Sequence, residues 1–111
     1  IEIQGTDSMM IAILLQHIPY PGEVLKDEIE YRKISQRKLA ENMGISYKIL
    51  NDILNCCRPV TTQTAMLFEA ALNVPADSLM RLQLKYNMQQ AAADPSFMER
   101  LKQVRKYAAM L

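Results

Sequence analysis

The sequence predicts an all-α fold. Half of its 111 residues are apolar, only three are glycine, and leucine, methionine, alanine, glutamine, lysine and glutamate are plentiful. This mixture favours helices over strands. Apolar residues also recur at intervals of three and four through most of the chain, which is the period of an amphipathic helix. A chain of this length is expected to fold as one domain around a single modest core.

The chain is expected to have three segments. Residues 1–18 are interpreted as an N-terminal arm or a cloning remnant, residues 19–93 as the helical domain and residues 94–111 as a C-terminal helix. Within the arm, the apolar run Met9–Leu15 is compatible with a short edge strand or a helix. It is far shorter than a membrane span, and it lacks the basic flank and cleavage site of a signal peptide. A cytoplasmic protein that makes no contact with a membrane is therefore predicted.

Four helices are predicted outside the central stretch of the domain. The first follows Pro19 and Pro21, residues that suit a helix start. The helix capped by Thr61 ends before Asn73, which can take the left-handed conformation usual for glycine. The predicted ranges are about 22–32, 62–72, 75–92 and 96–111, the last with an apolar stripe of Phe97, Leu101, Val104 and Ala108.

The central stretch, Ile34 to Leu54, predicts two short helices joined by a tight turn. Ser35 and Ser46 are good N-cap residues, and Gly44 can supply the left-handed conformation that ends the first helix. Two helices that cross closely need a small residue such as Ala40 between them. The apolar faces consist of Leu39, Ala40 and Met43, followed by Ile49, Leu50, Ile53 and Leu54. This pattern indicates a helix-turn-helix that binds DNA, with a helical hairpin that only packs as the alternative.

The outward positions of this stretch are basic and polar. From Ser35 to Arg58 four basic residues stand against two acidic ones, a local charge of +2 in a chain whose total is +1. Lysine and asparagine, found at positions 48 and 51, are residue types that read guanine and adenine edges, and a helix N-terminus offers N–H donors to phosphate. The candidate DNA-binding residues are Gln36, Arg37, Lys38, Ser46, Tyr47, Lys48, Asn51, Arg58 and Thr61.

Four sequence markers carry a family resemblance. They are PGE at Pro21–Glu23, ISQ…LA…GIS at Ile34–Ser46, ILN..RPVT at Ile53–Thr61 and LMRLQLKYNM at Leu79–Met88. With these markers, the chain from Pro19 to about Ala92 resembles the HigA-type antitoxins of bacterial toxin–antitoxin modules, within the Xre/Cro class of helix-turn-helix repressors.

The resemblance implies a five-helix, lambda-repressor-like helix-turn-helix domain, here with an additional C-terminal helix. It implies a homodimer that binds double-stranded operator DNA, represses its own operon and neutralises a RelE-like ribonuclease toxin. The second helix of the motif would enter the major groove with Tyr47, Lys48 and Asn51 toward the bases. Gln36 and Arg58 would hold the DNA backbone.

Some positions depart from the family pattern. Tyr20 stands where histidine is usual, Cys56 and Asn73 stand where glycine is usual, and Ser78 and Leu79 replace an aromatic pair. None of them is a proposed DNA-reading residue. At the end of the third helix, either Asn55 takes the left-handed conformation or the backbone is strained.

Other functions are weighed on the same residues. An enzyme is not predicted, because the chain has one histidine, no phosphate-cradling glycine-rich loop and no metal-ligand spacing; no cofactor or metal is expected. A stand-alone repressor without a toxin stays open. So does a protein-interaction module, in which Met9–Leu15 or the last helix contacts a partner, although that helix could also dimerise or pack on the core. Cys56 and Cys57 are either reduced structural thiols or, beside Arg58, redox sensors with a lowered thiol pKa.

Overall fold

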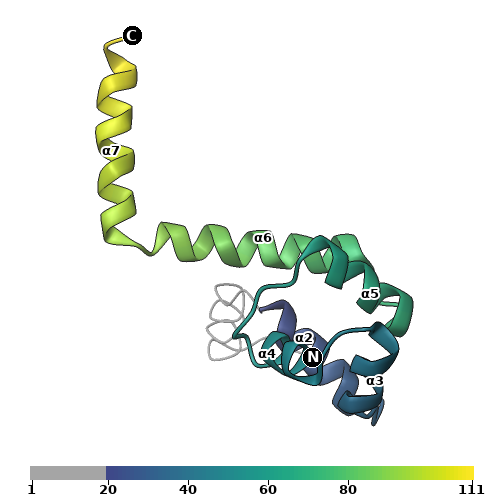
Figure 1. The fold of residues 1–111 in the computed structure, drawn as a ribbon. Helices are drawn as coiled ribbons and strands as arrows, with labels where there is room; N and C mark the ends of the chain where they lie inside the picture. The colour runs from purple at the N-terminus through teal and green to yellow at the C-terminus, as the bar shows by residue number, and fades with distance from the viewer. Residues whose placement is uncertain (1–19) are drawn as a thin grey trace, which may run out of the picture.

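The computed structural model describes residues 20–111, which form six α-helices and no strand (Figure 1). The helices are α2 (Pro21–Tyr31), α3 (Gln36–Met43), α4 (Tyr47–Leu54), α5 (Thr62–Leu72), α6 (Ala76–Ala92) and α7 (Pro95–Ala109). The all-α prediction is confirmed, and the predicted ranges differ from the observed ones by at most two residues. Met9–Leu15, for which a strand or a helix was left open, lies outside the described residues. Across residues 20–111, no helix is both long and apolar enough to span a membrane.

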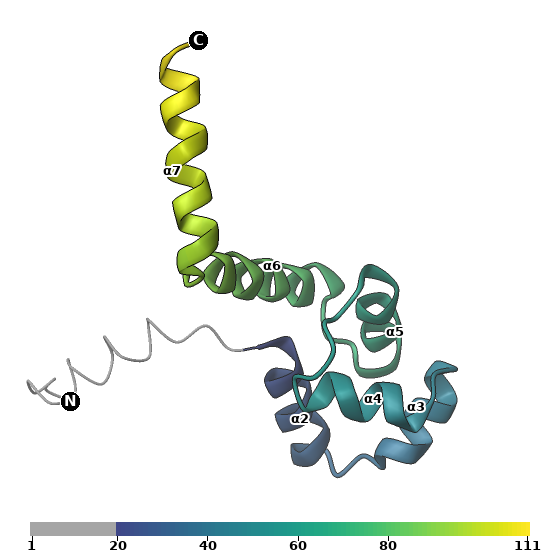
Figure 2. The same ribbon diagram turned by 60° about the vertical axis from the view of Figure 1, so that its left-hand side comes forward.

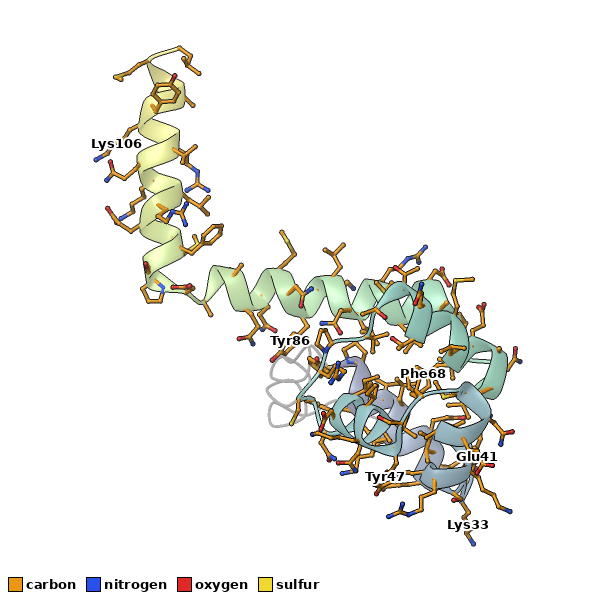
Figure 3. All side chains as sticks on the ribbon, viewed as in Figure 1. Lys33, Glu41, Tyr47, Phe68, Tyr86 and Lys106 are labelled. Carbon is orange, nitrogen blue, oxygen red and sulfur yellow. The ribbon has the colours of Figure 1, made fainter. Side chains whose placement is uncertain are left out.

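The hydrophobic core lies between α2, α3, α4, α5 and the first part of α6. Phe68 on α5 is fully buried and points from α5 toward the other helices (Figure 3). Burying a large apolar side chain of this kind stabilises the fold by roughly 1.5–3 kcal/mol. The buried residues around it include Leu25, Ile29, Leu39, Leu50, Ile53, Leu54, Leu72 and Leu79.

Four helices end at a residue with left-handed backbone, and only one of these residues is glycine. The φ angles are 56° at Lys33, 73° at Gly44, 64° at Cys56 and 60° at Asn73. After α3, the Gly44 N–H donates to the Glu41 carbonyl at 3.2 Å and the Ile45 N–H donates to the Ala40 carbonyl at 3.1 Å. This is the Schellman pattern, which satisfies the last carbonyls of a helix. The left-handed predictions at Gly44 and Asn73 are confirmed.

The end of α4 shows which residue takes the place of the missing glycine. Asn55 has φ −97°, so the alternative in which it is left-handed is wrong, and Cys56 takes this conformation. The Cys56 N–H donates to the Ile53 carbonyl and the Cys57 N–H donates to the Asp52 carbonyl, at 3.2 and 2.8 Å. A left-handed backbone costs a non-glycine residue roughly 1–2 kcal/mol. The alternative of a strained backbone is therefore the one that the structure supports.

Gly22 lies where α2 approaches the backbone of α4. A Cβ added at this position would overlap the carbonyl oxygen of Ile53. The glycine of the PGE marker is therefore explained by close packing of two helices and not by a special φ angle. Through this contact α2 braces the C-terminal half of α4.

The last helix projects away from the core. In both ribbon views α7 turns sharply from the end of α6 and extends outward (Figures 1 and 2). The Asp94 carboxylate starts it by accepting the N–H groups of Ser96 and Phe97 at 3.0 and 3.3 Å. No residue of α7 is buried, so the interpretation in which this helix packs on the core is wrong.

Replacing Gly44 with valine should lower the free energy of unfolding by about 1–2 kcal/mol, because a β-branched residue would be held at positive φ. Beyond the glycine and its two chain neighbours, no atom lies within 4 Å of the position that a Cβ would take, so the loss would come from the backbone alone. Gly44→Asn is the matched control and should lose less, since asparagine tolerates this conformation. Urea denaturation measures both variants, and equal losses would contradict the backbone explanation.

Candidate nucleic-acid interface

Helices α3 and α4 form a helix-turn-helix whose two starts are capped by serine. The Ser35 hydroxyl accepts the Lys38 N–H at 3.3 Å, and the Ser46 hydroxyl accepts the Ile49 N–H at 3.1 Å. Ala40 on α3 is buried, and α3 packs on α4. Both predicted caps are confirmed, and the small residue predicted for the helix crossing is buried.

The candidate DNA-binding residues come from three places: the start of α3, the first turns of α4 and the segment between α4 and α5. Figure 3 shows Tyr47 at the outer edge of the motif. Gln36 and Asn51 are half-buried, and the exposed candidates are Arg37, Lys38, Ser46, Tyr47, Lys48, Arg58 and Thr61. The structure therefore leaves seven of the nine candidates accessible to a large ligand.

A cation–π contact joins the starts of α3 and α4. The guanidinium carbon of Arg37 lies 4.4 Å from the centre of the Tyr47 ring. Arginine above an aromatic face is attracted by the ring quadrupole, so each side chain restrains the other. Both residues were predicted to contact DNA, but nothing in the sequence signals their pairing, because it depends on how the turn folds.

The Asp52 carboxylate lies between two of the predicted basic contacts. One of its oxygens is 3.2 Å from Lys48 Nζ and 3.9 Å from an Arg58 guanidinium nitrogen. The Asp52 side chain is 22% exposed, against 82% for Lys48 and 48% for Arg58. Asp52 was not among the predicted site residues. Its spacing of four from Lys48 on a helix was the available signal for the first contact.

A buried glutamine holds the segment that carries Arg58. Gln83 on α6 is 4% exposed, and its side-chain carbonyl accepts the Val60 N–H at 2.9 Å. Its amide nitrogen donates to Asn87 at 2.9 Å, and a further hydrogen bond joins it to Tyr20, whose pKa is raised mainly by burial. The Tyr20 ring meets Tyr86 edge-on with 4.5 Å between the ring centres. The glutamine of the LQ marker thus links α6 to the RPVT marker.

Thr61 has a structural part in this segment. Its hydroxyl accepts the Thr64 N–H at 3.3 Å, and its own N–H donates to the Thr64 hydroxyl at 2.8 Å. This reciprocal pair is a capping box at the start of α5, with threonine in place of the usual glutamate or glutamine. Contact between Thr61 and DNA stays a prediction.

The two cysteines lie between α4 and Arg58, are exposed and form no disulfide. Burial raises the pKa of the Cys56 thiol, the nearby Glu23 carboxylate raises it further, and Lys26 acts in the opposite direction. The alternative of a redox sensor with a lowered thiol pKa is therefore not supported for Cys56. Within residues 20–111, no group of three histidine, cysteine or acidic side chains is placed to hold a metal ion.

No family model matches the chain, and no curated protein matches its sequence. Solved structures do match. Pseudomonas aeruginosa antitoxin HigA, solved with the higBA promoter, is 28% identical with a TM-score of 0.67, over 76% of this chain and 94% of that one. A HigA-family addiction-module antidote protein from Coxiella burnetii is 25% identical with a TM-score of 0.65, over 82% and 95%. Pseudomonas aeruginosa PA4674, solved in complex with its operator DNA, is 29% identical with a TM-score of 0.66, over 76% and 92%.

The chain has the helix-turn-helix fold of the HigA-type antitoxins. The resemblance stated from the sequence markers is confirmed at this level. The similarity covers more than nine tenths of each of these three structures, so it includes nearly the whole of them. Three of the sequence markers now have physical reasons. Gly22 explains the PGE marker, the two serine caps explain the helix-turn-helix marker, and Gln83 explains the LQ marker.

Replacing Gln83 with methionine should lower the free energy of unfolding by about 1–3 kcal/mol, because the buried Val60 N–H would lose its acceptor. Gln103→Met on α7 is the matched control: that side chain pairs only with Glu99 on the exposed surface, and its loss should stay within about 0.5 kcal/mol. Chemical denaturation followed by circular dichroism compares the two. Similar losses would show that the Gln83 hydrogen bond does not hold the segment.

Proposed function

We propose that this protein is a DNA-binding antitoxin that represses transcription of its own type II toxin–antitoxin operon. The observation that carries the proposal is the exposed group of side chains on the helix-turn-helix, with Arg37 stacked on Tyr47 and Lys48 beside Arg58. The fold is that of HigA-type antitoxins, and the similar HigA and PA4674 structures were solved with promoter and operator DNA, respectively. Basic and polar side chains on one face of such a motif are what a duplex requires.

In the proposed complex, the start of α4 enters the major groove. The N–H groups in the first turn of a helix have no acceptor within the helix, so Ser46 and Tyr47 would present donors to a phosphate. Tyr47, Lys48 and Asn51 would face base edges, where lysine suits guanine and asparagine suits adenine. The proposed backbone contacts are Gln36, Arg37, Lys38, Arg58 and Thr61.

The proposal includes a homodimer formed through the elbow between α6 and α7. An apolar groove of about 400 Å³ lies there, lined by Met88, Ala91, Ala92, Phe97, Met98 and Leu101. Leu84 and Val104 on the same two helices are 60% and 61% exposed. Apolar surface of this kind usually marks an interaction site, and a two-fold dimer would bury it twice. Two such motifs would read half-sites roughly 34–36 Å apart.

The same proposal assigns a RelE-like ribonuclease toxin as the protein partner, on the strength of the resemblance. A stand-alone Xre-type repressor without a toxin is the second candidate, and it rests on the same helix-turn-helix. The gene adjacent to this one distinguishes them. Co-expression with its product should relieve toxicity and give a stable complex, whereas failure of both would leave the stand-alone repressor.

Lys48→Ala and Asn51→Ala should each weaken binding to promoter DNA by about 1–3 kcal/mol and relax the base preference, if the contacts to base edges are close. Lys85→Ala on α6 is the matched control for lost charge and should change neither quantity. Electrophoretic mobility shifts with the promoter and with point-mutated promoters measure both. Unchanged affinity and selectivity in both variants would exclude them as reading residues.

Arg58→Ala should weaken binding to every duplex alike and make the salt dependence shallower by about one unit of log Kd against log salt, as expected for one lost phosphate contact. Arg81→Ala, which removes an arginine paired with Asp77 on α6, is the control and should leave the slope unchanged. Fluorescence anisotropy titrations at several salt concentrations give the slopes. The phosphate role fails if the slope of the Arg58 variant equals that of the wild type.

Leu84→Glu combined with Val104→Glu should convert the dimer to a monomer, because four carboxylates would be buried at the two-fold interface. Both side chains are exposed, so the fold of a single chain should survive. Met66→Glu on α5, also 60% exposed, is the control and should remain dimeric. Analytical ultracentrifugation measures the mass, and a dimer that persists in the double variant would place the interface elsewhere.

A further inference from the structure

Asp52 is the one acidic side chain on α4, the helix proposed to enter the major groove. Its carboxylate approaches both Lys48 and Arg58 through the same oxygen, at 3.2 and 3.9 Å. Its backbone carbonyl accepts the Cys57 N–H at 2.8 Å and so helps to end the helix. The Asp52 carboxylate therefore contacts Lys48 within the helix and Arg58 in the segment that follows it.

This arrangement acts against contact with phosphate. The negative charge of Asp52 offsets part of the attraction of Lys48 and Arg58 for the DNA backbone. The Asp52 carboxylate also repels any phosphate that would take its place beside these two residues. At 22% exposure the carboxylate is partly sheltered from water, so salt screens it less than a surface charge. The penalty applies to any duplex, whatever its sequence.

The operator and other DNA differ in the hydrogen-bond acceptors that they offer to Lys48. On a non-operator duplex Lys48 has only phosphates to contact, and leaving Asp52 brings little advantage. On the operator, Lys48 would exchange the carboxylate for acceptors on a base edge, which carry the sequence information. Asp52 would then weaken the two kinds of binding unequally.

We propose that Asp52 is a specificity-determining positioning residue, which holds Lys48 and Arg58 and thereby lowers affinity for non-operator DNA more than for the operator. The inference rests on the proposed function, because it assigns α4 to the DNA. It adds an acidic residue to a surface from which only basic and polar residues were expected to act.

Asp52→Asn tests the inference, since it removes the charge and preserves the size of the side chain and the backbone hydrogen bond. Asp77→Asn is the matched control. Asp77 pairs with Arg81 at 3.4 Å on α6, and its replacement changes the net charge by the same amount as Asp52→Asn. The probes are the duplex upstream of the chain's own gene and a scrambled duplex of equal length and composition. Fluorescence anisotropy is measured at three salt concentrations.

The Asp52 variant should bind the scrambled duplex about tenfold more tightly and the promoter at most about twofold more tightly. Its salt dependence on scrambled DNA should steepen by about one unit of log Kd against log salt, because one more phosphate would be neutralised. The Asp77 variant should show neither change. In a background that carries Lys48→Ala and Arg58→Ala, the Asp52 substitution should no longer alter the ratio of the two affinities.

Equal gains on both duplexes would overturn the inference and reduce Asp52 to one negative charge among others. Weaker binding to both, with an unchanged melting curve by circular dichroism, would also overturn it and make Asp52 a support for binding. The inference would also be overturned if Asp52→Asn still changed the ratio of the two affinities in the background that carries Lys48→Ala and Arg58→Ala. Failure of the proposed function is visible separately: the wild type would then bind neither duplex, before any Asp52 variant is compared.

Discussion

The position of α4 depends on Gly22, because α2 can approach the backbone of α4 only where no side chain intervenes. A Cβ there would overlap the Ile53 carbonyl oxygen. The opposite end of α4 is set by the Ser46 cap and by the Arg37–Tyr47 contact. A helix that is fixed near both ends holds its outer side chains in one position relative to the core. A surface that fits the groove of a duplex needs side chains positioned in this way.

Short connections between the helices explain the unusual backbone of this chain. After α2, α3, α4 and α5 the backbone turns through a left-handed residue, although glycine is present at only one of these four places. Lys33, Cys56 and Asn73 take the conformation because the hydrogen bonds that close the helix ends and the packing of the next helix outweigh the local strain. Asparagine is the least strained of the three, and the Cys56 position carries the strain beside the segment that leads to Arg58.

The helices could be predicted because their signals are local. Ser35, Gly44 and Ser46 mark boundaries by their own chemistry, and the apolar spacing within α2 to α5 identifies the buried face. The DNA-binding candidates could be named for the same reason, since they lie on the outer side of a recognisable motif. Asp52 and Gln83 were not assigned a role, because the first acts on a residue beyond the end of its helix and the second reaches a backbone N–H 23 positions away. The direction of α7 also has no local signal, since an amphipathic helix packs on a core and projects from it with the same sequence pattern.

Three of the four basic DNA-binding candidates are already engaged within the chain. Arg37 lies over Tyr47, while Lys48 and Arg58 share Asp52. For these three residues, binding to a duplex is an exchange of partners, so its net strength depends on how well the new partners replace the old. A chain with a total charge of only +1 has little attraction for DNA at long range, and it must rely on this local exchange. The apolar elbow of α6 and α7 lies well away from α4 in both ribbon views. Assembly through the elbow could therefore set the spacing of two reading helices without altering the contacts that each makes.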